Sequence, residues 1–242
     1  MKISVVTISY GKGAALKRTY ASVHSQRLPA GVTLDHILVV SDRDFDASAY
    51  PEARVVYVPA DGCYRAMNAG LALCSGDVIG LLHGGDVYAA DNVLVYVADA
   101  FADGLVDFVY GDLYYSRRDG TGCSRFYSSA KFTPERLSQG FAPPHPTLFV
   151  RRAVARELGP YDTDYLVASD FDYFIRLYDH RPAYKGMRID KTMVCMEPGG
   201  LSNSWRNRLW FSNLERYKAL KKNRGHASFL YLLRRYYYHF FQ

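Results

Sequence analysis

The sequence predicts an α/β protein built on a doubly wound sheet with helices on both faces. Runs of β-branched and other apolar residues alternate with segments of helical periodicity through the first half of the chain, as in a sheet with crossover helices. Several of the apolar runs end in glycine, serine or aspartate. The 242 residues are 49% hydrophobic and 22% charged, which suits one α/β domain with a large core.

The first strand is expected at Ile3–Tyr10, where nearly every residue is apolar, as in a strand that is buried on both faces. A helix over Ala14–Gln26 follows it. The other strands of this half are expected at His36–Asp42, Ala53–Pro59, Asp77–Leu82 and Val106–Tyr115. The other helices are expected at Tyr64–Cys74, which Ser75-Gly76 would stop, and at about Ala90–Phe101.

Beyond Tyr115 the alternation is less regular. Helical periodicity returns at Val167–Asp179, and Ser169 or Asp170 is expected to cap this helix. The other recognisable segments are a proline-rich extended run, a glycine turn and a basic aromatic helical region: Phe141–Arg152, Glu197–Ser204 and the residues from Trp205 onward.

The bulk composition leaves several partners open. A net charge of +6 and a pI near 9.0 suit a nucleic acid, an anionic membrane or a phosphorylated substrate, although a solvated basic surface explains them as well. The four cysteines form no CxxC pair, which disfavours a zinc site and suits a reducing compartment. No signal-peptide pattern and no run near the roughly 20 apolar residues of a spanning helix is found. A cytoplasmic protein is expected.

The polar ends of three predicted strands are the expected place for a ligand, because doubly wound sheets bind ligands where their parallel strands end. These ends are Ser9-Tyr10, Ser41-Asp42 and Gly84-Gly85-Asp86. The glycines would let a diphosphate approach the backbone while Asp86 binds Mg²⁺ or Mn²⁺. An ordinary turn in which Asp86 caps the next helix explains the same pattern equally well.

Four segments resemble family 2 glycosyltransferases in order and spacing, over about Ile3–Ser204. They are ISVVTISYGKG, DGCYRAMNAGLALCSGDVIGLLHGGDVY, the stretch from PPHPTLFV to ASDFDYFIRL, and EPGGLSNS. The resemblance implies a GT-A fold with a Rossmann-like mixed sheet. It also implies a catalytic domain at 1–204, divided into a nucleotide-sugar half (1–115) and an acceptor half (116–204), before a helical extension at 205–242.

The same resemblance assigns roles to the residues that match the family's motifs. Asp170 matches the general base, and Asp86 matches the last acid of the metal-binding Asp-x-Asp motif, with Mn²⁺ or Mg²⁺ as the cofactor. The donor-binding positions are Thr7, Ser9, Tyr10, Asp42, Asp61, Asn68, Gly85 and Asp86. The positions of the acceptor or diphosphate loop are His145, Gly199, Gly200 and Ser202.

The sequence departs from the family pattern at the metal motif. The residues His83–Asp86 (His-Gly-Gly-Asp) stand where the family usually has Asn-Ser-Asp-Asp, so this motif offers one carboxylate. A subset of the family with Asn-Ser-Gly-Asp also has a single carboxylate there. Asp170 is expected to deprotonate an acceptor hydroxyl that attacks the anomeric carbon. A cation at Asp86 would stabilise the leaving nucleoside diphosphate. Asp172 is the rival base, but it faces another side of the helix and is expected to pair with Arg176.

The resulting hypothesis is an inverting, hexosyl-type transfer. The donor would be a UDP-sugar, or second a GDP-sugar, and the acceptor a hydroxyl of a lipid-linked glycan in surface-polysaccharide synthesis. The alternative is a degenerate member that only binds glycan or nucleotide; the missing first acid favours it, and the presence of Asp86 and Asp170 opposes it. A nucleotidyltransferase would need a phosphate-binding Gly-Lys motif, and Gly11-Lys12-Gly13 is too short for one.

Residues 205–242 mix arginine and lysine with tryptophan, phenylalanine, tyrosine and leucine. Basic helices of this kind often lie on anionic membranes, where a lipid-linked acceptor would be found. Alternatively, the segment covers the catalytic domain or forms a homodimer interface. Nucleic acid is not expected as a partner, because no recognised binding motif accompanies the basic residues.

Overall fold

The centre of the molecule is a parallel half-sheet that the N-terminal strand shares with three others. Every residue from Ile3 to Ile8 is buried, as in a strand that is covered on both faces. The computed structural model describes residues 1–10, 13–117, 122–197 and 205–228. Strand β1 (Lys2–Ser9) pairs in parallel with β2 (Thr33–Val40) and with β4 (Val78–Leu81), and β2 pairs in parallel with β3 (Ala53–Tyr57).

The other half of the sheet contains antiparallel pairs, which makes the sheet mixed. Strand β8 (Phe149–Arg151) joins β4 to β6 (Phe108–Ser116), and it is antiparallel to both. Strand β9 (Gly186–Met196) is parallel to β6, while β5 (Val87–Tyr88) is antiparallel to β9. The strand order is β3-β2-β1-β4-β8-β6-β9-β5, and β7 (Cys123–Tyr127) pairs with β6 off this path. The expected mixed sheet is confirmed.

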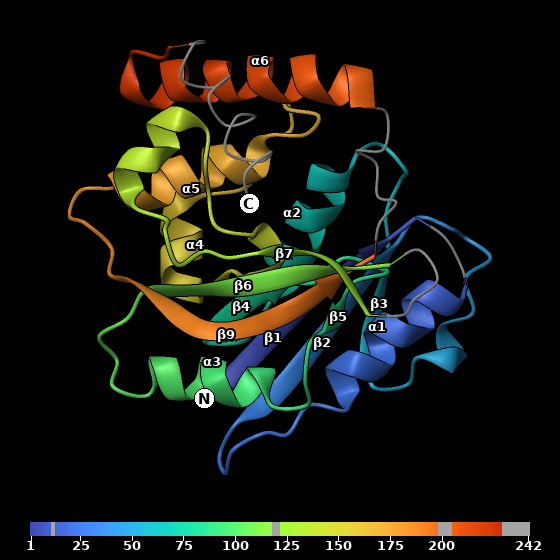
Figure 1. Cartoon of the computed structure of the whole chain (residues 1–242). Helices are drawn as coiled ribbons and strands as arrows, with labels where there is room; N and C mark the ends of the chain where they lie inside the picture. Colours follow the sequence, from blue (N-terminus) through green and yellow to red (C-terminus); the bar gives the residue numbers. More distant parts are fainter. Residues whose placement is uncertain (11–12, 118–121, 198–204, 229–242) are drawn as a thin grey trace.

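Helices cover both faces of the sheet, as expected (Figure 1). Alternate residues of β1 point to opposite faces: Val5 packs in one core with Val97, and Val6 packs in the other with Met67. One face carries α1 (Ala14–His24) and α3 (Val93–Phe101), and the other carries α2 (Cys63–Leu73), α4 (Arg152–Leu158) and α5 (Ser169–Asp179). Short 3₁₀ helices occur at Ala47–Ala49, Pro134–Gln139 and His145–Thr147.

Helix α6 (Trp205–Arg224) lies across α5 on the outside of the molecule (Figure 1). Ala219 and Leu220 are buried in the same core as residues of α5. Asn223 donates to the Asp172 carboxylate at 2.8 Å. The described part of the basic aromatic segment therefore covers the domain, which was one of its alternatives. Among the described residues, no helix is both long and apolar enough to cross a membrane.

Gly70 explains how closely α2 approaches the sheet. A Cβ atom built on Gly70 would lie 2.3 Å from Val6 Cγ1 and 3.0 Å from Val39 Cγ2. Only a glycine fits between the helix and these two β-branched side chains. Part of the AMNAG block is therefore a packing requirement: it seats α2 on β1 and β2.

A chain of polar side chains runs beneath β1, from the surface into the core. His24 Nδ1 lies 2.7 Å from the Glu52 carboxylate. His24 Nε2 lies 3.0 Å from His36 Nδ1, and His36 Nε2 lies 2.9 Å from Thr7 Oγ1. His36 is 2% exposed. Burial, and second the neighbouring His24 charge, lowers the pKa of His36 to about 3, although Asp35 acts in the opposite direction.

We predict that this buried histidine makes the fold less stable in mild acid. The folded-state pKa of His36 lies below its usual 6.5, so the unfolded chain binds the extra proton. The stabilisation is complete above about pH 6.5 and is lost as the pH falls toward 3. In His36→Gln, the decrease in unfolding free energy between pH 7.5 and 5.5 should be smaller than in the wild type by about 1.4 kcal/mol.

Urea unfolding of both proteins at the two pH values measures this difference. Titrating groups that are far from His36 are common to both proteins and cancel in the comparison, whereas His24, which contacts His36, contributes to the measured difference. Equal decreases would mean that His36 titrates in the folded state as it does in the unfolded chain.

Candidate active site

The ends of β1, β2 and β4 meet at one edge of the sheet, as predicted. The backbone N–H of Gly84 donates to Ile8 O at 2.9 Å, which brings the turn after β4 against the end of β1. Ser9 is half-buried there and Tyr10 is 41% exposed. Burial, followed by the charges of Cys63 and Asp61, raises the pKa of Tyr10 to about 12. Tyr10 and Asp61 therefore lie close together at the surface beside these strand ends.

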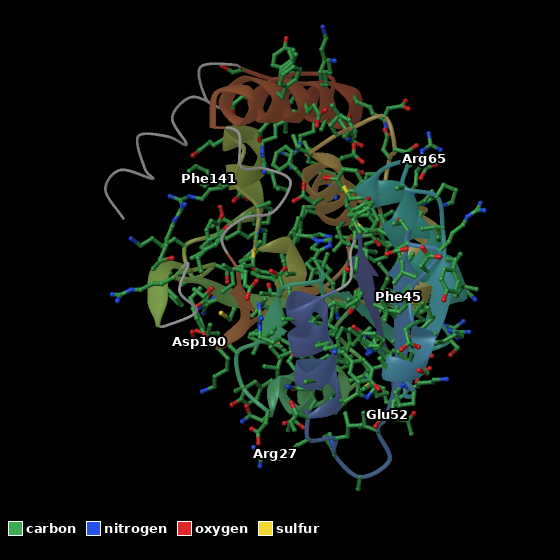
Figure 2. All side chains as sticks on the ribbon, turned by 90° about the vertical axis from the view of Figure 1, so that its right-hand side faces the viewer. Arg27, Phe45, Glu52, Arg65, Phe141 and Asp190 are labelled. Carbon is green, nitrogen blue, oxygen red and sulfur yellow. The ribbon has the colours of Figure 1, made fainter. Side chains whose placement is uncertain are left out.

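Asp42 and Asp61 sit at the surface of the same region. One Asp42 oxygen accepts the backbone N–H of Asp44 at 3.0 Å, so this side chain holds a turn after β2. Asp61 lies 3.7 Å from Arg65 of α2, and both are about half exposed. Figure 2 shows Arg65 at the outer surface of the molecule. Both aspartates remain accessible at the predicted donor edge.

The two glycines after β4 have structural reasons of their own. A Cβ on Gly84 would lie 3.1 Å from Ser9 Oγ and 3.2 Å from Ile8 O. Gly85 has a φ of +112°, which L side chains rarely adopt. Its N–H donates to Thr19 Oγ1 of α1 at 2.8 Å. Strand packing and a positive φ are therefore enough to explain both glycines, without the approach of a diphosphate that their pattern in the sequence suggests.

Asp86 is a buried carboxylate with an unused oxygen. It is 5% exposed, and its Oδ2 has no hydrogen-bond partner among the described residues. Burial raises the pKa of Asp86 to about 7; a hydrogen bond from the Glu197 backbone N–H opposes the shift, and the Glu197 charge adds to it. A buried oxygen without a partner is costly unless a cation or donor binds to it. The residue therefore fits a divalent cation, which favours carboxylate oxygens.

Two of the predicted donor residues, Thr7 and Asn68, have hydrogen-bond partners inside the protein. Thr7 is fully buried and bonded to His36, as described above. Asn68 donates to Tyr161 O at 2.8 Å and accepts from Tyr161 N at 2.8 Å, so its amide fixes the loop after α4 to α2. Both side chains therefore hold structural elements next to the site. The contact of Asn68 with Tyr161, 93 positions away, has no signal in the sequence.

Residues from two other helices hold the start of α5, on which Asp170 lies. The expected cap at Ser169 or Asp170 is wrong: the N-cap residue is Ala168, and it makes no side-chain cap bond. Glu215 of α6 accepts the three backbone N–H groups that precede the helix, those of residues 166–168, at 2.8–3.0 Å. Tyr64 of α2 accepts the N–H of Ser169 at 3.2 Å. A remote carboxylate stabilises this helix end more than a local hydroxyl would.

Asp170 and Asp172 have different surroundings, although they are two residues apart. Asp172 is fully buried, and Arg176 binds it at 2.8 Å, as expected; Asn223 binds its second oxygen at 2.8 Å. Asp170 is half-buried, accepts the N–H of Phe171 at 2.7 Å and lines a cleft. The geometry thus leaves Asp170 accessible to a substrate and Asp172 engaged in holding helices together.

The cleft has a volume of about 230 Å³ and is lined by residues of β6, β7 and β9, of the loop 140–146, and of α5 and α6. Of the described residues that line it, Asp170 is the only acid, and Arg216 supplies a guanidinium from α6. His145 also lines the cleft; its Nε2 lies 2.8 Å from Tyr161 Oη, so Asn68 and Tyr161 together orient this imidazole. Burial lowers the pKa of His145 to about 4.

His83 stacks on His145 with ring centroids 6.2 Å apart. Burial, and second the His145 charge, lowers the pKa of His83 to about 4, while Asp170 acts in the opposite direction. Both imidazoles are therefore neutral at pH 7 and can donate or accept a hydrogen bond. His83 thus lies between the turn after β4 and the cleft residue His145.

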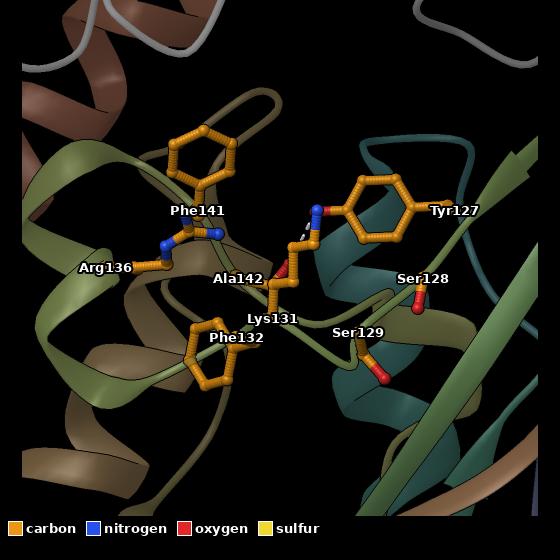
Figure 3. Close-up of a pocket in the computed structure, with 8 residues that line it drawn as sticks. All are labelled: Tyr127, Ser128, Ser129, Lys131, Phe132, Arg136, Phe141 and Ala142. Carbon is orange, nitrogen blue, oxygen red and sulfur yellow. Dashed lines mark hydrogen bonds between the residues drawn. The ribbon is translucent and has the colours of Figure 1, made fainter. Parts of the chain in front are cut away.

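A smaller aromatic and basic notch shares a wall with the cleft (Figure 3). Its volume is about 30 Å³. Tyr127 Oη donates to Ala142 O at 2.9 Å, and these two residues belong to both hollows. Lys131 and Arg136 reach the notch beside aromatic rings, and no acid lines it among the described residues.

The predicted loop residues Gly199, Gly200 and Ser202 lie outside the described residues. Within the described part of the chain, no group of three or more histidine, cysteine or acidic side chains is placed to hold a metal ion. A cation at this site would therefore complete its shell with water and ligand oxygens, which magnesium commonly does.

Comparison with known proteins identifies relatives along most of the chain. The family model described as glycosyl transferase family 2 matches residues 4–159. An uncharacterized glycosyltransferase of Mycobacterium tuberculosis is 29% identical over 182 residues, which are 72% of this chain and 68% of the relative. A PGL/p-HBAD biosynthesis glycosyltransferase of Mycobacterium bovis is 30% identical over 145 residues, which are 59% of this chain and 54% of that one.

Solved structures confirm the expected GT-A fold. Staphylococcus aureus TarS 1-349 in complex with UDP-GlcNAc has a TM-score of 0.67 at 15% identity, covering 93% of this chain and 68% of that one. The mannosyltransferase PcManGT of Pyrobaculum calidifontis, in complex with GDP-Man and Mn²⁺, has a TM-score of 0.61 at 16% identity, covering 89% and 64%. This chain thus spans about two thirds of the length of these structures.

We predict that Asn68→Ala destabilises the fold by about 2–4 kcal/mol, because it leaves a buried N–H and a buried C=O of Tyr161 without partners. Urea unfolding measures the change. The matched control is Arg65→Ala on the same helix, which removes one exposed ion pair and should cost less than about 1 kcal/mol. Equal stability of the two variants would mean that Asn68 is free to bind a ligand instead.

Proposed function

This chain belongs to glycosyl transferase family 2, and on that premise we propose that it transfers a sugar from a nucleotide diphosphate sugar to an acceptor hydroxyl. The observation that carries the proposal is the half-buried Asp170 carboxylate at the wall of the cleft beside the donor edge. A carboxylate in that position can accept the proton of a hydroxyl that enters the cleft.

We propose a single displacement with inversion at the anomeric carbon. The acceptor oxygen attacks the anomeric carbon, the bond from that carbon to the diphosphate oxygen breaks, and Asp170 takes the hydroxyl proton. One acid suffices for this step, and Asp170 is the only acid that lines the cleft among the described residues. Arg176 and Asn223 bind both oxygens of the rival carboxylate, Asp172, and this supports the assignment of Asp170 as the base.

The donor end is proposed to be the edge formed by Ser9, Tyr10, Asp42 and Asp61, with Asp86 as a ligand of Mn²⁺ or Mg²⁺. The unpartnered Oδ2 of Asp86 supports this role. A bound cation would supply positive charge to the diphosphate as it leaves. A UDP-sugar is the preferred donor and a GDP-sugar the second, in line with the ligands named for TarS and PcManGT.

The acceptor is proposed to be a lipid-linked glycan. The aromatic notch beside the cleft, with Lys131 and Arg136, offers stacking surfaces and positive charge to a sugar chain that bears an anionic group. A relative named for PGL/p-HBAD biosynthesis supports an acceptor of this general kind. The hexosyl type of the donor and the homodimer remain predictions.

We predict that Asp170→Asn lowers the turnover rate by about 10²–10⁴-fold, because the base is lost, while the KM for the sugar nucleotide changes little. Slow hydrolysis of UDP-sugars and GDP-sugars without acceptor gives the assay, and the faster series indicates the donor. The matched control is Asp172→Asn, which removes the same charge from a buried ion pair and should lower the melting temperature while the folded fraction stays active.

An unchanged rate in Asp170→Asn would exclude this residue as the base. A lost rate in Asp172→Asn with an unchanged melting temperature would assign the base to Asp172. Wild-type protein that hydrolyses none of the sugar nucleotides, yet binds them, would favour the alternative of a binding protein without catalysis.

We propose further that the outer face of α6 contacts an anionic membrane surface. Five exposed residues lie on one side of this helix, at helical spacing: Phe211, Leu214, Lys218, Lys221 and Lys222. Apolar side chains beside lysines are the composition of helices that lie in the membrane interface. A protein located at the cytoplasmic face of the membrane remains the expectation.

We predict that the protein sediments with phosphatidylglycerol vesicles and much less with phosphatidylcholine vesicles. Leu214→Glu should weaken binding about tenfold or more, because it removes an apolar contact and adds a repelled charge. The matched control is Leu105→Glu, which changes a leucine that is also exposed (61%, against 44% for Leu214) and lies far from α6 along the chain. Equal vesicle binding by both variants would mean that α6 packs on the domain but does not contact the membrane.

A further inference from the structure

The two positions after β4 at which the metal motif lacks an acid are both glycines, and an added side chain would be crowded at one and strained at the other. Gly84 packs against Ser9 Oγ at 3.1 Å and Ile8 O at 3.2 Å, measured from an added Cβ. Gly85 holds a φ of +112°. An aspartate would strain the backbone at position 85, and at position 84 it would require Ser9 and Ile8 to shift by a few tenths of an ångström. A second carboxylate for a cation near Asp86 must therefore come from another part of the chain.

The pairing of β5 with β9 brings such a carboxylate to the turn. Val87 is opposite Cys195 in this antiparallel pair, and counting two positions outward sets Gly85 opposite Glu197. Two further contacts agree with this register. The Glu197 backbone N–H hydrogen-bonds the Asp86 carboxylate, and an added Cβ on Gly85 would lie 3.8 Å from Glu197 Oε2. The Glu197 side chain thus extends over the glycine of the motif.

The charges at this turn favour a bound cation. Asp86 is 5% exposed and its Oδ2 has no partner among the described residues, while Glu197 is about half-buried beside it. Two like charges in a partly dehydrated place repel each other. Arg18 of α1 contacts the Glu197 carboxylate and offsets one of them. Its guanidinium is partly exposed, so it can turn away when another cation approaches Glu197.

We infer that Glu197 is the second carboxylate ligand of the divalent-cation site formed with Asp86, in place of the acid that is absent at positions 84 and 85. This inference rests on the proposed function, which assigns Asp86 to the cation. The site takes a hard divalent cation such as Mn²⁺, which two carboxylates, waters and diphosphate oxygens together coordinate.

Manganese binding tests the inference without any turnover. Electron paramagnetic resonance of free Mn²⁺ gives the dissociation constant, with and without saturating UDP, for the wild type and for Asp86→Asn, Glu197→Gln, Glu197→Asp and Arg18→Gln. Asp86→Asn and Glu197→Gln should each weaken binding by at least about tenfold, the size of effect that even outer-sphere partners have on metal affinity. Glu197→Asp should recover part of the loss, because it keeps the carboxylate.

Arg18→Gln is the matched control, because it breaks the same ion pair from the other side. If Glu197 serves only to bind Arg18, both variants weaken Mn²⁺ binding equally and the inference is wrong. If Glu197 is a ligand, Arg18→Gln binds Mn²⁺ alone at least as tightly as the wild type, since the competing guanidinium is gone. Melting temperatures of all variants confirm that they are folded before the comparison.

The two levels of the proposal fail in different ways. If Asp86→Asn weakens Mn²⁺ binding and Glu197→Gln does not, the assignment of Glu197 is wrong, while the proposed role of Asp86 at the donor site stands. Wild-type binding of Mn²⁺ by both variants, or no binding by the wild type with UDP present, would overturn the cation site of the proposed function itself.

Discussion

The parallel pairing of β1 with β2 and β4 is the constraint on which the rest of the molecule depends. Parallel strands require long crossover connections, and these become the helices on the two faces. The register sets Ser9 at the end of β1 beside Val40 at the end of β2, and the Gly84 N–H after β4 donates to Ile8 O. The ends of these three strands therefore form one edge of the sheet. The predicted donor residues Ser9, Tyr10 and Asp42 follow directly from these strand ends.

The acceptor side depends on a second set of contacts that are far apart in sequence. Tyr64 and Asn68 on α2, packed on the sheet through Gly70, hold the start of α5 and the loop that carries Tyr161. Glu215 of α6 supports the same helix end. Helix α2 therefore links the two halves: one face contacts β1, and one end orients the elements that present Asp170 and His145.

The sequence predicted β1–β4, β6 and α1–α3 close to their observed bounds, because each segment has one clear pattern, either a β-branched apolar run or helical spacing of apolar residues. It did not predict β9 or the order β8-β6-β9-β5, because these pairings join segments that local patterns cannot relate. The candidate site divides in the same way. Residues that end strands, such as Tyr10 and Asp86, follow from strand position and family resemblance. The inward roles of Thr7 and Asn68, and the capping role of Glu215, depend on partners that only the fold brings near.

Asp170 and Asp172 show how the fold gives two identical side chains different uses. Both lie in the first turn of α5, where the helix dipole favours a negative charge. Asp172 faces α6, and a guanidinium and an amide occupy its two oxygens, so its charge is balanced inside the protein. Asp170 faces the cleft, and the one hydrogen-bond donor to its carboxylate among the described residues is the neighbouring backbone N–H of Phe171. Since a base must exchange a proton with a substrate, the less satisfied carboxylate is the one that can act. The same reasoning applies to Asp86, whose unused oxygen is tolerable in a buried turn only if a cation or a proton completes it.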